Sequence, residues 1–223
     1  MRILVACEET QTVTTELRKL GHEAYSCDIC ECSGGHPEWH IQQDVVPLLN
    51  GRCTFKDCMG VEHTIDGKWD MIIAFPPCTY LTNASSVRMR VKGEIVPERY
   101  QKAMEAKDFF MKFYTVDCDM ICIENPTPMK LVDLPPYAQA IQPWWFGDPY
   151  TKRTCLWLKD LPYLQPTNVV WDNVWPYVNG FTRRPDEMYE DSGARERVAK
   201  FRSRTFPGIA KAMAEQFAGE NRG

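Results

Sequence analysis

The stretch DMIIAFPPCTYL, residues 70–81, is an apolar run that stops on two prolines and then presents a cysteine. The apolar part predicts a buried strand. Pro76 and Pro77 fix φ and remove two amide donors, so the turn after the strand is stiff and the thiol of Cys78 is held in one direction. A reactive thiolate must be both exposed and positioned, and a rigid turn at a strand end provides both. The alternative is an ordinary turn around a small, buried cysteine.

Similar apolar runs on either side predict further strands, and helical patterns separate them. Strands are expected at residues 2–7, 23–28, within 39–49, at 70–75, 119–126 and 153–158. Helices are expected at residues 9–21, ended by Gly21, at 97–114, opened by Pro97, and at 207–218. This alternation predicts an α/β domain with a mostly parallel sheet.

The composition fits one domain of ordinary size. The chain has 223 residues and a net charge of -4. We therefore expect a single domain over residues 1–223. The net charge argues against a large basic face that grips long duplex DNA and leaves a local nucleic-acid contact open. No apolar span reaches the length of a bilayer, and the start is too short and too soon acidic for a signal peptide. A cytoplasmic protein with reduced cysteines and no membrane partner is expected.

Polar residues stand at the ends of several predicted strands. They are Cys7, Glu8 and Thr10, then Asp28, Asp44, the turn at residues 76–78, and the pair Glu124 and Asn125. Ligands in open α/β sheets bind beyond the carboxyl ends of the strands, so these residues are expected to converge on one cleft. A carboxyl group such as Glu124, placed after an apolar run, can have a raised pKa and donate a proton to a ring nitrogen. The alternative is a Glu-Asn pair that caps the next turn.

A thiolate and a carboxylic acid at adjacent strand ends suit one reaction. The thiolate adds to C6 of a pyrimidine while N3 is protonated, and C5 then becomes a nucleophile that takes a methyl group from a sulfonium donor. Here the sequence resembles the S-adenosylmethionine-dependent cytosine-5 methyltransferases. FPPCTY is similar to the Pro-Cys nucleophile motif of that family and IENP to its Glu-Asn motif, in the same order along the chain.

The resemblance implies a Rossmann-like methyltransferase fold with helices on both faces of the sheet, and S-adenosylmethionine as the cofactor. It implies that Cys78 is the nucleophile, that Glu124 contacts N3 and that Asn125 supports the catalytic turn. DPYTKRTCLWL is similar to the family's basic motif, which makes Arg153 a catalytic candidate. Cofactor contacts are implied for Cys7, Glu8, Thr10, Asp28 at the ribose, Ile29, Asp44 at the adenine, and Pro76. Substrate contacts are implied for Pro77, Thr79, Lys152, and Arg88 and Arg90 of the loop that closes over the substrate.

The chain also departs from the family pattern. The first loop, ACEETQ, has no glycine, so Glu8 or Thr10 is expected to hold the methionine end of the cofactor. The basic motif lacks the usual glutamine and has one arginine. Residues 159–205, a possible small irregular insert, stand where family members that act on DNA carry a recognition domain. The short insert favours a free cytosine nucleotide such as dCMP, which we expect as the substrate. The motif order favours DNA, which is the alternative. A monomer or a homodimer fits either substrate.

Two other interpretations remain. The first is a non-catalytic relative that binds a nucleotide or DNA, supported by the glycine-free loop; short chains of this kind resemble phage or prophage products. The second is a zinc site, suggested by Cys27, Cys30 and Cys32 with two histidines downstream. The cysteine spacing does not form paired C-x2-C knuckles, so we expect no metal and a loop around the cofactor cleft instead.

Overall fold

The computed structural model describes residues 1–172, 174 and 204–219. The insert expected over residues 159–205 lies for the most part outside these ranges. Within them, no helix is both long and apolar enough to span a bilayer.

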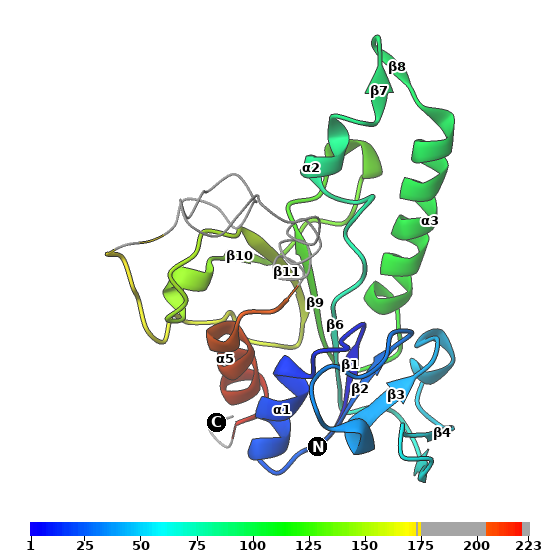
Figure 1. Cartoon of the computed structure of the whole chain (residues 1–223), viewed down its shortest axis with the longest axis vertical. Helices are drawn as coiled ribbons and strands as arrows, with labels where there is room; N and C mark the ends of the chain where they lie inside the picture. Colours follow the sequence, from blue (N-terminus) through cyan, green and yellow to red (C-terminus); the bar gives the residue numbers. More distant parts are fainter. Residues whose placement is uncertain (173, 175–203, 220–223) are drawn as a thin grey trace, which may run out of the picture.

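A seven-stranded sheet forms the centre of the molecule (Figure 1). In spatial order its strands are β3 (His40–Gln42), β2 (Glu23–Asp28), β1 (Arg2–Ala6), β6 (Met71–Ala74), β9 (Met120–Pro126), β11 (Thr154–Lys159) and β10 (Gln139–Ile141). Neighbours from β3 to β9 are parallel, whereas β11 is antiparallel to both β9 and β10. Counted along the chain, these strands read 3-2-1-4-5-7-6. This is the doubly wound order with an antiparallel strand inserted before the last one.

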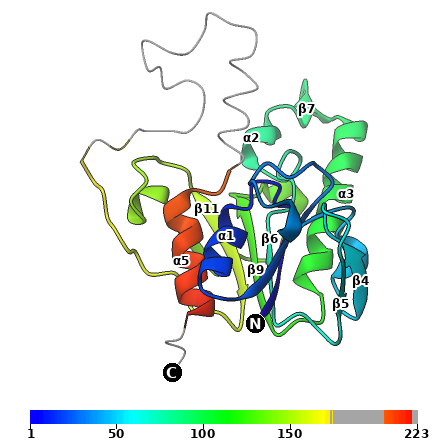
Figure 2. The ribbon, with the colours of Figure 1, turned by 60° about the horizontal axis from the view of Figure 1, so that its bottom comes forward.

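Helices cover both faces of the sheet, as Figure 2 shows. α1 (Thr12–Lys19) and α5 (Pro207–Ala218) share one hydrophobic cluster with Val5 of β1 and Ile73 of β6. α3 (Pro97–Tyr114) packs on the other face, where Phe110 joins the cluster that contains Leu4 and Ile72. Central strands are therefore buried on both sides, which is why each reads as a continuous apolar run. The predicted Rossmann-like α/β fold, with a mostly parallel sheet between helices, is confirmed.

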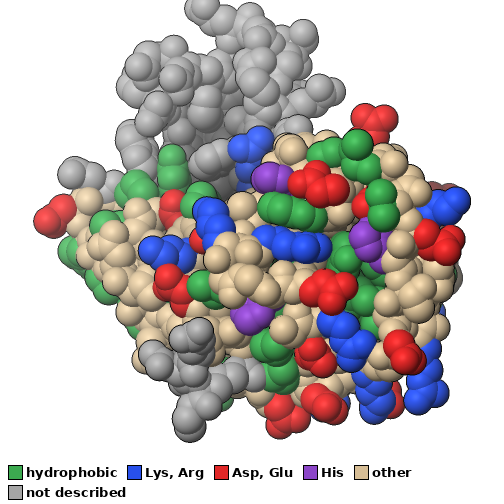
Figure 3. All heavy atoms as spheres, turned by 90° about the horizontal axis from the view of Figure 1, so that it is seen from below, with side chains coloured by type: hydrophobic (Ala, Val, Ile, Leu, Met, Phe, Trp, Pro, Cys, Tyr) green, Lys and Arg blue, Asp and Glu red, His purple; other side chains and the backbone are tan. Residues whose placement is uncertain are grey.

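Smaller elements surround the sheet and were not expected from the sequence. β4 (Cys53–Lys56) and β5 (Glu62–Ile65) form one hairpin. Residues 82–96, here called the arm, contain α2 (Asn83–Ser86) and the hairpin of β7 (Arg90–Val91) and β8 (Glu94–Ile95), and they project from the end of the molecule shown at the top of Figure 1. Four short 3-10 helices lie at Pro37–Trp39, Val46–Leu48, Lys130–Val132 and Pro143–Trp145. On the underside, opposite the arm, acidic and basic side chains are interspersed (Figure 3).

Candidate active site

The register of two central strands brings the two main sequence motifs together. Ala74 at the end of β6 pairs with Ile123 of β9, and the strands are parallel, so the Pro-Pro-Cys turn leaves β6 beside Glu124 and Asn125. The Asn125 side chain is fully buried and its Nδ2 donates a hydrogen bond of 3.0 Å to the carbonyl oxygen of Pro76. Asn125 therefore bonds to the turn that presents Cys78, rather than capping the turn that follows it in the chain.

The turn around Cys78 is tied down on both sides. Pro76 is buried, Pro77 and Thr79 are exposed, and Cys78 is half-buried. The amide of Leu81 donates to the carbonyl of Cys78 at 3.0 Å, and the Ser85 hydroxyl bonds to the carbonyl of Thr79. The turn is thus held by these two hydrogen bonds in addition to the two prolines.

The segments that follow the two motifs also pair with each other. Thr82 and Pro128 form an isolated antiparallel bridge, and the amide of Met129 donates to the carbonyl of Leu81 at 2.8 Å. The segments that carry Cys78 and Glu124 are therefore joined three times: by the pairing of β6 with β9, by the Asn125 side chain, and by the bridge between Thr82 and Pro128.

Glu124 is half-buried at the sheet end, in an environment that favours its neutral form. Burial raises the pKa of its carboxyl, while the charge of Lys152 and a hydrogen bond from Thr154 oppose the rise. The upward direction follows from desolvation, which penalises the carboxylate. The expected proton donor thus lies where its proton is retained to higher pH than in water.

The antiparallel direction of β11 explains how a basic motif reaches the same edge. Because β11 begins where β9 ends, Lys152 and Arg153 precede its first residue at the edge that carries Glu124. Arg153 is exposed, and its Nη2 donates to the hydroxyl of Tyr137 at 2.9 Å. Lys152 donates to the carbonyl of Arg204 at 3.3 Å. The structure places both residues at the candidate site, with Arg153 directed to a tyrosine.

The glycine-free first loop adopts a glycine-like backbone. Cys7 has a φ of 59° and Gln11 a φ of 55°, in the left-handed region that glycine usually occupies. The amide of Cys7 donates to the carbonyl of Cys27 at 2.7 Å, which fixes the loop against the end of β2. Two non-glycine residues therefore provide the sharp bends that glycine usually provides.

Glu8 is placed differently from the other predicted cofactor residues. Its side chain is 3% exposed, and its carboxylate accepts bonds from the amides of Val13 and Thr14, at 2.6 and 3.2 Å, and from the Thr14 hydroxyl at 2.7 Å. It therefore caps the start of α1 from inside the protein. Burial raises the pKa of the Glu8 carboxyl to about 7, although these three bonds oppose the rise.

The other predicted cofactor residues gather at the carboxyl edge of β1, β2 and β3. Burial raises the pKa of the Cys7 thiol, and the charges of Asp28 and Asp44 add to the rise, so both carboxylates lie within electrostatic reach of this thiol. Ile29 is 75% exposed beside Asp28. An exposed isoleucine next to the Asp28 carboxylate fits a ligand with an apolar ring and hydroxyl groups. These residues fit S-adenosylmethionine at this edge.

Gln11 is a structural residue that the sequence did not reveal. Its buried side chain bonds to Ser26, to the amide and carbonyl of His36 and to Cys32. A Cβ added to Gly34 would lie 2.5 Å from both the Cβ of Gln11 and the carbonyl of Thr10. The loop at residues 29–36 is therefore seated directly on the first loop, and glutamine carries no sequence signal for such a position.

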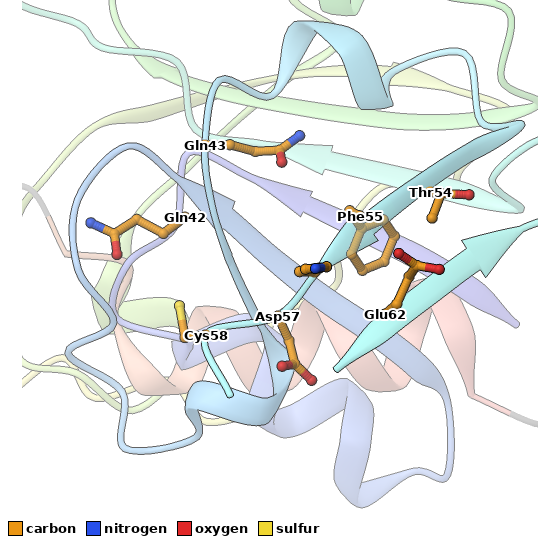
Figure 4. Close-up of a pocket in the computed structure, with 8 residues that line it drawn as sticks. Gln42, Gln43, Thr54, Phe55, Asp57, Cys58 and Glu62 are labelled. Carbon is orange, nitrogen blue, oxygen red and sulfur yellow. The ribbon is translucent and has the colours of Figure 1, made fainter. Parts of the chain in front are cut away.

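The two predicted substrate residues that remain, Arg88 and Arg90, lie on the arm. Arg88 and Arg90 are exposed on the arm, and Arg90 donates to the carbonyl of Gly93 at 2.8 Å. In the described part of the chain, no three His, Cys, Asp or Glu side chains gather as a metal ion would require. A pocket of about 580 Å³ lies between the end of β3 and the β4–β5 hairpin (Figure 4), and none of the residues that line it is a predicted site residue.

Comparisons with known proteins add a distant structural likeness. No family model matches the chain, and no curated protein matches it. A solved structure that is similar is that of a proposed DNA modification methyltransferase encoded within an E. coli prophage, with 14% identity and a TM-score of 0.41. The match covers 83% of this chain and 56% of that one. At this level the likeness does not identify an activity or a substrate.

Proposed function

We propose that this protein is an S-adenosylmethionine-dependent methyltransferase that acts on C5 of cytosine. The observation that carries the proposal is the 3.0 Å bond from Asn125 to the carbonyl of Pro76. It joins the turn of the nucleophile to the strand of the acid, so Cys78 and Glu124 are held as one unit. A thiol and a carboxyl group held in this way suit addition to a pyrimidine ring.

In the proposed reaction the two groups act at opposite ends of one conjugated system of the ring, C6=C5–C4=N3. The thiolate of Cys78 forms a bond to C6, and Glu124 gives its proton to N3, so that the electron pair of the ring is delivered to C5. When bound, S-adenosylmethionine supplies an electrophilic methyl group. After transfer, solvent takes the proton from C5, the bond between C6 and sulfur breaks, and N3 returns its proton to Glu124.

The residues proposed to hold the cofactor are those of the carboxyl edge. Asp28 suits the ribose hydroxyls, Asp44 the adenine, and Ile29 the apolar face of the ring. Cys7 and Thr10 lie on the loop that would face the methionine end, while the Glu8 carboxylate holds that loop to α1. Glu8 is thus proposed to shape the cofactor site, in addition to any contact with the cofactor itself.

The test is methyl transfer from labelled S-adenosylmethionine to dCMP, dCTP, CMP, single-stranded DNA and duplex DNA in parallel. The product is identified as 5-methylcytosine by mass spectrometry. Cys78→Ala should abolish transfer, whereas Cys53→Ala, at a half-buried cysteine of β4 that has no proposed role in catalysis or cofactor binding, should leave it unchanged. Equal loss in both variants, or label on a ring atom other than C5, would refute the assignment.

A covalent trap gives a second readout. A substrate with fluorine at C5 has no proton to lose after methylation, so the bond between Cys78 and C6 cannot break and the adduct accumulates. Intact mass should increase by the mass of the methylated substrate, and peptide mapping should place it on Cys78. Covalent catalysis would be excluded if the fluorinated compound formed no adduct although the same compound without fluorine is methylated.

A further inference from the structure

A pocket of about 400 Å³ lies beside the turn that carries Cys78, and the proposed reaction makes no use of it. Its lining consists of Pro77 and Tyr80 on the turn, and of Lys102, Glu105, Ala106 and Phe109 on α3. Because Pro77 is bonded to Cys78, the pocket begins one residue from the proposed nucleophile. Its volume lies within the range of small-molecule sites, about 300–1,000 Å³.

We propose that this pocket holds the nucleotide adjacent to the target cytosine, so that the substrate is a nucleic-acid strand rather than a free nucleotide. This inference rests on the proposed function and deepens it, because it names the substrate class. The sequence alone favoured dCMP by a narrow margin, on the length of a segment that lies largely outside the described residues.

The chemistry of the pocket suits a base and its phosphate. The guanidinium carbon of Arg99 lies 5.5 Å from the centroid of the Tyr80 ring, and Nζ of Lys102 lies 5.8 Å from it. Both cations lie over the Tyr80 ring as cation–π partners. Proteins that bind single strands combine aromatic rings, on which bases stack, with cations that pair with the backbone phosphates. The carboxylate of Glu105 can accept a hydrogen bond from an exocyclic amino group.

Arg99 retains capacity for an anion. Its Nε is buried and has no hydrogen-bond partner within the described structure. Arg99 also lies in the first turn of α3, an 18-residue helix whose N-terminus carries a partial positive charge. A phosphate oxygen would satisfy the donor and be stabilised by both charges.

The positive charge extends further than one nucleotide requires. Arg88, Arg90 and Lys92 are exposed on the arm, and Arg99 and Lys102 follow at the start of α3. A mononucleotide offers a single phosphate group, which two or three cations can bind. Five cations spread over the arm and α3 instead suit the successive phosphates of a strand.

The first test measures binding without requiring catalysis. A fluorescein-labelled single strand of about ten nucleotides with one central cytosine is titrated with the Cys78→Ala protein, and binding is followed by anisotropy. Tyr80→Ala in the same background should weaken binding about five- to 150-fold, as expected for the loss of one base–aromatic stack. Tyr80→Phe should preserve it. The affinity for dCMP should change less than about twofold, because the pocket would bind the neighbouring nucleotide.

The second test uses a matched pair of lysines and does not depend on the tyrosine variant being folded. Lys102→Gln should lower the slope of log affinity against log salt by about 0.7, the value for one phosphate contact of a single strand. Lys112→Gln, exposed on the same helix about 15 Å further along, should leave the slope unchanged. Parallel titrations with DNA and RNA of one sequence show which sugar the protein prefers. A lower salt slope in Lys102→Gln with either strand supports the strand site.

The outcomes separate this inference from the proposed function. Binding that is unchanged in Tyr80→Ala and Lys102→Gln overturns the inference, as does methylation of dCMP without binding of any oligonucleotide. An equal loss of dCMP affinity in Tyr80→Ala also overturns it, because Tyr80 would then hold the target nucleotide. Strand binding that responds to Tyr80 and Lys102, without methyl transfer to any cytosine, would support the strand site and refute the methyltransferase instead.

Discussion

Replacing Glu8 by glutamine should change the way in which the stability of this protein depends on pH. Burial raises the pKa of the Glu8 carboxyl from 4.5 to about 7. Between these two values the folded protein binds a proton that the unfolded chain has released. The free energy of unfolding therefore contains a favourable contribution from Glu8 below pH 4.5, which is lost as the pH rises to 7. A glutamine at this position has no proton to lose.

The magnitude follows from the same two values. At about 1.4 kcal/mol per pH unit, the difference between 4.5 and about 7 amounts to roughly 3.4 kcal/mol over the whole range, and roughly 2.5 kcal/mol of it falls between pH 5 and pH 8. Glu8→Gln also weakens the bonds to Val13 and Thr14, which costs about 1 kcal/mol or more at every pH. The variant should thus be less stable than the wild type at pH 5 and should gain on it by about 2.5 kcal/mol at pH 8.

Urea unfolding at half-unit steps between pH 5 and pH 8 measures this difference directly. Glu16→Gln is the matched control on α1, because the Glu16 carboxylate is partly exposed and bonds to Lys19 at the surface. Its effect on the free energy of unfolding should be small, below about 1 kcal/mol, because a surface ion pair contributes little. Suppose that Glu8→Gln changed the free energy of unfolding by a constant amount, within about 0.5 kcal/mol. The hydrogen bonds from α1 would then offset the desolvation of the carboxylate fully, and the raised pKa of Glu8 would be refuted.

Three further predictions concern the candidate site. Asn125→Ala leaves the Pro76 carbonyl without its donor, and should cost about 1–3 kcal/mol in urea unfolding and about 100-fold in kcat; a stability loss with normal kcat would contradict the positioning role. Glu124→Gln should lower kcat by about 10²–10⁴-fold. Because the pKa of Glu124 is raised and its protonated form donates, the fall of wild-type kcat at high pH should disappear in this variant. Gly34→Ala should weaken S-adenosylmethionine binding in calorimetry, because its Cβ would meet the first loop at 2.5 Å. Gly35→Ala is the control, because a Cβ at Gly35 meets no atom within 4 Å, and it should cost only about 1–2 kcal/mol of stability for its positive φ. Equal losses of cofactor affinity in the two variants would contradict the close approach of Gly34 to the first loop.

Most of the sheet could be predicted from the sequence because its strands are buried on both faces. Met71–Ala74 is apolar throughout, and a run of this kind needs no knowledge of its neighbours. α3 begins at Pro97 as predicted, since proline suits the first turn of a helix. The β4–β5 hairpin was not predicted because its short strands are partly exposed and lack an apolar run.

The candidate site could be predicted in its residue types but not in its contacts. Cys78, Glu124 and Asn125 were identified from motifs at strand ends, and the parallel register explains why the turn of Cys78 leaves β6 beside the other two residues. The partner of Asn125 depends on two strands that are distant in the sequence. Glu8 was expected to face the cofactor because it follows β1, but the short distance to α1 allows its carboxylate to turn inward and cap the helix. Local sequence does not distinguish these two directions.

The left-handed backbone at Cys7 and Gln11 also bears on the thermodynamics of ligand binding. A glycine at either position would give the unliganded loop many conformations, and a ligand would have to select one of them. Residues with a Cβ have far fewer, and the bonds from Cys7 to Cys27 and from Gln11 to Ser26 and His36 already select one. The loop has therefore lost much of its conformational entropy when the protein folds, and ligand binding at this edge should carry a correspondingly small entropic penalty.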